Sequence, residues 1–131
     1  MQPGTLRHVV HVRVFVRPDS WDASLAFYAA ALGLSLQVRD DVHRHALFTF
    51  ASGPTLGLEQ DVPDDGEPPA SGKFTGISFQ VDDVDRVHAE LVARGVTFVH
   101  PPETMFWGGR LAHLQDPSGN VLTLAQYPKP V

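Results

Sequence analysis

The chain repeats one pattern of elements twice, and this repeat limits the folds that it can adopt. Residues 33–36 (Gly-Leu-Ser-Leu) and residues 95–98 (Gly-Val-Thr-Phe) each follow a helix-like segment, and they lie 62 residues apart. Each half reads as a strand, a helix and then three strands. Repeated units of this kind bury their hydrophobic faces only against a neighbour. The sequence therefore predicts an α+β fold built from two βαβββ modules.

In the first half, residues 8–17 predict a strand. Valines at positions 10, 12, 14 and 16 alternate with Val9, His11, Arg13 and Phe15. One face is therefore a core face, and the other mixes polar and aromatic groups, as in a strand that borders a wet cavity. Residues 34–39, 45–50 and 55–60 predict the three further strands.

The helix of the first half is expected to start at residues 18–20, with Asp19 or Ser20 as its N-cap. Gly33 is expected to follow its last turn. An apolar stripe of four residues, spaced as on one helical face, supports this helix: Trp21, Leu25, Tyr28 and Leu32.

In the second half, residues 75–81, 96–100, 109–115 and 121–126 predict strands. A helix with the stripe Val84, Val87 and Leu91 is expected between Asp82 or Asp83 and Gly95. The chain is thus expected to be one domain, 1–131, with modules 6–60 and 74–127. The Pro/Asp/Gly-rich residues 61–73 are interpreted as the linker.

Each helix can cover only one face of its sheet. The other face needs a partner sheet, either in the same chain or in a second subunit. A concave cleft between two such sheets is the expected place for a small ligand.

Composition excludes several classes of function. The net charge of −5 is concentrated in residues 61–73, which hold four acids and one base, and no basic stripe exists to bind nucleic acid. No apolar run approaches the ~18 residues that span a bilayer, so we expect a cytoplasmic protein without membrane contact. The absence of cysteine excludes thiolate catalysis and a Cys-ligated zinc.

Residues 116–120 (Asp-Pro-Ser-Gly-Asn) predict a tight turn between the last two strands. Pro117 fixes φ, Asp116 can accept backbone N–H bonds, and Gly119 and Asn120 tolerate positive φ.

This turn, the run Ser24-x-x-Phe27-Tyr28 with Leu32-Gly33, and the duplicated pattern together resemble the vicinal oxygen chelate superfamily. The superfamily includes glyoxalase I, bleomycin-resistance proteins and extradiol dioxygenases. The resemblance implies paired βαβββ modules that form an open, cleft-containing β-sheet barrel, commonly used as a homodimer.

The resemblance also implies where a metal would bind, with one ligand on each of the first, fourth, fifth and eighth strands. His11 and Glu59 fit the first two positions, but Gly76 and Thr123 occupy the other two. A catalytic zinc normally keeps three protein ligands, and a non-haem iron needs two histidines and a carboxylate. The residues therefore favour a protein without a complete catalytic metal site.

Seven residues are the candidate ligand contacts. His11, Arg13, Phe15, Gln80 and His113 come from alternating strands, and Trp107 and Arg110 come from a Trp-Gly-Gly-Arg segment. That segment is similar to the Trp-Gly-Arg stretch of bleomycin-resistance proteins, which bind drug in a crevice at the dimer interface. The alternative is that Trp107 caps the sheet while Arg110 pairs with a nearby acid. The candidates are His11, Arg13, Phe15, Gln80, Trp107, Arg110 and His113.

The sequence is compatible with three functions. The favoured one is binding of a small aromatic or anionic, antibiotic-like ligand without a cofactor. The alternative is a metal-dependent glyoxalase-like lyase or dioxygenase that uses His11 and Glu59 with Ni, Zn, Mn or Fe. A third is an interaction module whose cleft is filled.

Overall fold

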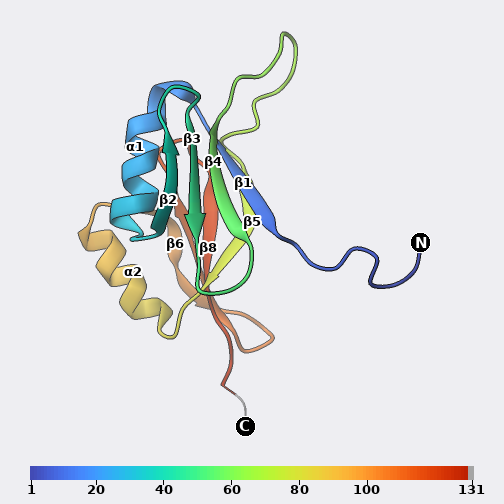
Figure 1. Ribbon diagram of the computed structural model, residues 1–131. Helices are drawn as coiled ribbons and strands as arrows, with labels where there is room; N and C mark the ends of the chain where they lie inside the picture. The colour runs from blue at the N-terminus through green and yellow to red at the C-terminus, as the bar shows by residue number, and fades with distance from the viewer. Residues whose placement is uncertain (130–131) are drawn as a thin grey trace.

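The computed structural model describes residues 1–129, which form two four-stranded sheets (Figure 1). The first sheet contains β1 (His11–Val16), β2 (Ser35–Asp40), β3 (His45–Thr49) and β4 (Thr55–Gln60). The second contains β5 (Phe74–Gln80), β6 (Thr97–Thr104), β7 (Arg110–Gln115) and β8 (Val121–Gln126).

The two sheets have the same topology, which confirms the predicted duplication. Their strand orders are β1-β4-β3-β2 and β5-β8-β7-β6. The first and fourth strands of each module pair in parallel, while the other neighbours are antiparallel. The sheets remain separate rather than closing into a barrel, in agreement with the predicted open arrangement.

The first helical segment has three parts: η1 (Pro18–Ser20), α1 (Trp21–Ala26) and the wider π-helical η2 (Phe27–Ala31). It ends at Gly33, whose φ of +67° is easily adopted by glycine. The predicted side-chain N-cap is wrong. The side chain of Ser20, the N-cap residue of α1, accepts no cap bond; its hydroxyl donates to the Arg17 carbonyl at 3.0 Å and lies against the Ser118 hydroxyl instead.

The second helix, α2 (Val84–Ala93), follows its sequence signals closely. Asp83 is the N-cap, and its side chain accepts from the Arg86 backbone N–H at 3.2 Å. Arg94 is the C-cap, and Gly95 follows with a φ of +87°. The predicted start and end of this helix are therefore confirmed.

Two strands, β1 and β6, have bounds that differ from the predicted ones. The first strand begins at His11 rather than at residue 8, and the exposed Val9 and Val10 lie in the N-terminal segment that projects from the body (Figure 1). β6 continues to Thr104 because it stays paired with β7 beyond the predicted end at residue 100. Residues 61–73 contain no helix or strand. Within residues 1–129 no helix has the length and apolar character needed to cross a bilayer.

One hydrophobic cluster joins both sheets and both helices. The strand residues that point into it are Val14, Val16, Ala46, Phe48, Leu56, Leu58, Ala112, Leu114, Leu122 and Leu124. From the helical segment, Tyr28 is fully buried and packs on Phe48 with ring centroids 6.1 Å apart. Because side chains alternate along a strand, the alternate residues face away from this core. We call these two surfaces the outer faces of the sheets.

The turn at residues 116–120 is built around the buried Asp116 carboxylate. Asp116 Oδ1 accepts from the backbone N–H groups of Ser118 (2.8 Å) and Asn120 (3.0 Å). Its Oδ2 accepts from Asn120 Nδ2 (2.9 Å) and from the Tyr28 hydroxyl (2.7 Å). The predicted role of Asp116 is confirmed, and Gly119 has a φ of +81°. Burial raises the pKa of the Tyr28 phenol, so that it remains a protonated donor.

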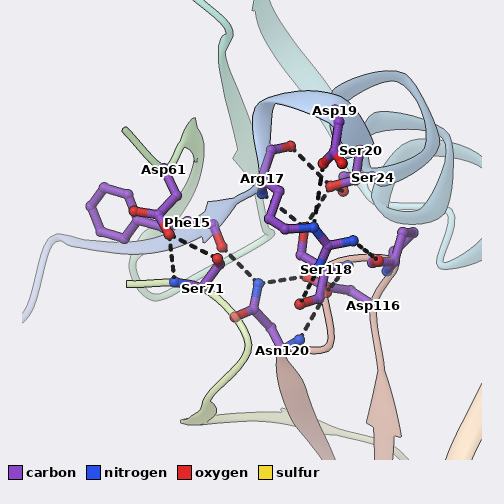
Figure 2. A network of polar contacts seen from close by, with 11 residues as sticks. Phe15, Arg17, Asp19, Ser20, Ser24, Asp61, Ser71, Asp116, Ser118 and Asn120 are labelled. Atoms are coloured by element: carbon purple, nitrogen blue, oxygen red, sulfur yellow. Dashed lines mark hydrogen bonds and ion pairs between the residues drawn. The ribbon is translucent and has the colours of Figure 1, made fainter. Parts of the chain in front are cut away.

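The same turn is bonded to the first module, as Figure 2 shows. Arg17 donates to the Ser118 carbonyl (3.1 Å) and the Pro117 carbonyl (3.2 Å), and Asn120 Nδ2 donates to the Phe15 carbonyl (2.7 Å). These bonds connect the two modules at one end.

Candidate functional site

The outer face of the first sheet carries the three candidates from β1. His11 Nδ1 lies 2.7 Å from Thr55 Oγ1, and its ring lies over Gly57. A Cβ at position 57 would lie 2.8 Å from two ring atoms of His11, so the imidazole occupies the space that a side chain at position 57 would need. Arg13 and Phe15 follow on the same face at alternate positions.

A second histidine, not included among the candidates, lies on this face beside Glu59. His45 pairs with Glu59 across β3 and β4, and Nε2 of His45 is 4.0 Å from Oε1 of Glu59. The sequence signal was available, because His45 alternates with the core residue Ala46. The face therefore presents two imidazoles, a carboxylate and a guanidinium.

The outer face of the second sheet is organised around His113. Its Nδ1 lies 2.8 Å from Thr123 Oγ1, the residue opposite it on β8. The rings of Phe74 and His100 pack edge-on against it, with centroids 5.6 Å and 5.3 Å away. Gln80 belongs to this face, since it is the alternate neighbour of Phe79, which faces the core.

The environment of His113 predicts a pH dependence of stability. Burial lowers the pKa of His113 below its ordinary 6.5, and the charge of His100 lowers it further against the opposing effect of Glu103. Because the unfolded chain then binds this proton more readily, the stabilisation is fully present above about pH 6.5 and is lost as the pH falls toward the folded-state pKa.

We expect wild-type protein to lose more stability than His113→Gln between about pH 6.5 and about pH 5. Urea unfolding at several pH values measures this difference. An NMR titration that placed the pKa of His113 at or above 6.5 would contradict the expectation.

The residues at the four metal positions do not fit a catalytic metal. Gly76 lies at an irregularity in the β5–β8 pairing and has a φ of +74°, so a ligand side chain there would be strained. Thr123 is buried and bonded to His113. Among residues 1–129, the side chains of His, Asp and Glu form no group of three that could hold an ion.

Arg110 and Trp107 lie apart from the outer-face residues. The Arg110 guanidinium forms a bidentate pair with Asp85 of α2, with two N···O distances of 2.9 Å, and lowers the pKa of that carboxyl. The Trp107 indole lies against Gly109, where a Cβ would clash with it. Its ring centroid is 5.8 Å from that of Tyr127, and the two ring planes are tilted by 38°. This geometry matches the alternative in which Arg110 pairs with an acid.

The structure therefore places five of the seven candidates on the two outer faces. The other two, Trp107 and Arg110, lie on neither. His11, Arg13 and Phe15 share one outer face, while Gln80 and His113 share the other. A groove of about 580 Å³ between the modules is lined by Gln80 but by none of the other six candidates. Its walls come from the apolar, core-facing residues, such as Val12 and Leu56.

This fold, with two βαβββ modules of the same topology, defines a known class of protein. The sequence model of the Glyoxalase/Bleomycin resistance protein/Dioxygenase superfamily matches residues 6–124. The chain belongs to this superfamily.

Three relatives show how the chain compares within it. A superfamily member from Sphaerobacter thermophilus DSM 20745 is 30% identical, with a TM-score of 0.76 over 92% of this chain and 97% of that one. TnmS3, an antibiotic binding protein from Streptomyces sp. CB03234, is 30% identical. Its TM-score is 0.75, and the match covers 95% of this chain and 98% of that one. The uncharacterized protein YraH of Bacillus subtilis (strain 168) is 28% identical over 127 residues, 88% of this chain and 95% of its own.

Proposed function

We propose that this protein binds a small, partly aromatic or anionic molecule and does so without a complete catalytic metal site. The observation that carries the proposal is the kind of residue found at the four positions expected to hold a metal. Two of the four metal positions hold Gly76, in a left-handed backbone conformation, and Thr123, which is bonded to His113. The similarity to the antibiotic binding protein TnmS3 supports an antibiotic-like ligand.

The proposed ligand lies between two outer faces that belong to different copies of the chain. Within one chain both outer faces point away from the shared core, and no helix within residues 1–129 packs on them. They leave Arg13 and Phe74 exposed. Pairing the first sheet of one copy with the second sheet of another would place His11, Arg13 and Phe15 opposite His113 and Gln80. A homodimer would then contain two equivalent sites.

The proposed contacts omit Arg110, because its guanidinium is committed to Asp85. Trp107 remains a candidate only for the edge of the site, since its indole already contacts Gly109 and Tyr127.

A complementation experiment tests the composite site. A thermal-shift screen of antibiotics and aromatic acids first selects a compound that stabilises the wild type, because a ligand that binds the folded state raises its stability. We expect His11→Ala and His113→Ala each to abolish the shift, and the exposed His43→Gln to retain it. A purified heterodimer of the two alanine variants should recover about half of the binding sites, since one of its two sites contains both histidines.

Failure of the heterodimer to bind, or a monomer in light scattering, would contradict the composite site. A separate measurement tests whether the protein holds a catalytic metal. Elemental analysis of untagged protein is expected to find no stoichiometric divalent metal. One tightly held metal per chain, with turnover stimulated by Ni, Zn, Mn or Fe(II) and lost in His11→Ala, would establish the lyase or dioxygenase alternative.

A further inference from the structure

We propose that the groove between the two modules is a second ligand site, which binds an amphipathic carboxylate such as a medium-chain fatty acid. The groove has a volume of about 580 Å³, within the roughly 300–1,000 Å³ of small-molecule sites. It lies on the helix-bearing side of the sheets. Ser78 and Gln80, from the outer face of β5, also line it, but neither His11 nor His113 does.

The walls of the groove are apolar and incompletely buried. Residues from both modules contribute, and they pack against the core while remaining partly open to solvent. Covering such surface is favourable because apolar area is removed from water. The residues that matter most here are Val12, Ala31, Leu32, Ile77, Phe79 and Val87.

The charges at the groove favour an anion. Two charged side chains line it, Glu90 and Arg94. Glu90 is already paired with Arg86 one turn earlier on α2, at 3.2 Å. Arg94 donates one N–H to the Ala31 carbonyl at 2.7 Å, which orients its guanidinium, and it forms no ion pair within residues 1–129.

An oriented guanidinium beside an apolar groove is suited to one chemistry. Guanidinium binds carboxylate in a bidentate fork, and the apolar walls accept an alkyl or aryl body. A ligand in this position would contact both modules. Here the modules are joined by the Arg94–Ala31 bond and by Phe50 and Phe79, whose ring centroids lie 6.1 Å apart.

Titration calorimetry of the full chain with sodium decanoate tests the site. We expect saturable binding that weakens about tenfold or more in Arg94→Gln, because a charged hydrogen-bonded pair is lost. Arg7→Gln, which removes the same charge from the exposed N-terminal segment, should bind like the wild type. Ala31→Trp, which places an indole in the groove, should also reduce binding, and circular dichroism verifies that each variant is folded.

Two further measurements separate this site from the outer-face site. Decyltrimethylammonium, with the same chain and the opposite charge, should bind much more weakly than decanoate. His11→Ala should leave decanoate binding unchanged, whether or not the same substitution abolishes binding of the antibiotic-type ligand. The proposal is overturned if decanoate does not bind, if the cation binds equally well, if both groove variants bind like the wild type, or if His11→Ala abolishes binding.

Discussion

Asp116→Asn is expected to lower the free energy of unfolding by about 3 kcal/mol. The two carboxylate oxygens of Asp116 accept four hydrogen bonds, two on each oxygen, and the group is buried. An asparagine would replace one acceptor oxygen by an NH₂ group that faces donors. Two buried donors would then lose their partner, and the contact from Tyr28 or from the turn would break.

Urea unfolding followed by circular dichroism measures this loss. The matched control is Asp64→Asn, which makes the same change on an exposed residue of the linker and should shift the stability by less than about 0.5 kcal/mol. If Asp116→Asn were as stable as the control, the carboxylate could not be what connects the turn to the first module.

Phe48→Ala is expected to cost about 4 kcal/mol of stability, because it removes a completely buried ring from a central strand. The ring packs on Tyr28, which in turn donates to Asp116. The cavity would therefore loosen the residue that connects the two modules. The same urea titration measures the effect, and the free energy of unfolding is the quantity compared.

Phe106→Ala is the control for this substitution, since Phe106 is 99% exposed and should tolerate the change. The double variant Phe48→Ala/Tyr28→Phe adds a test of coupling. We expect its loss to differ from the sum of the single losses, because residues in contact are not additive. Strict additivity would indicate that the ring of Phe48 does not position the Tyr28 hydroxyl.

Much of the fold could be predicted because its signals are local. The alternation at β4 and β8 gave their observed ends, and Asp83 and Gly95 bounded α2 through capping chemistry that depends only on nearby residues. The failed prediction at Ser20 has a tertiary cause. Its hydroxyl is engaged by Arg17 and by Ser118, about a hundred residues away.

The candidate site was predictable only in part. The alternation in β1 correctly separated its core-facing valines from the outer-face residues His11, Arg13 and Phe15. It did not predict which side chains from other strands would lie beside each of them. His45 was missed although it pairs with Glu59. Arg110 was expected as a possible ligand contact, yet its partner Asp85 lies 25 residues earlier, on a helix that the fold brings beside β7.

The sequence by itself determined the two βαβββ modules and the buried faces of their strands, because residue identity and spacing are sufficient for both. The tertiary structure decided how the modules are arranged. They pack through their apolar, helix-bearing faces, since this buries the largest continuous hydrophobic surface, and the outer faces are left open. That packing also formed the apolar groove beside Arg94, which no local pattern of residues specifies.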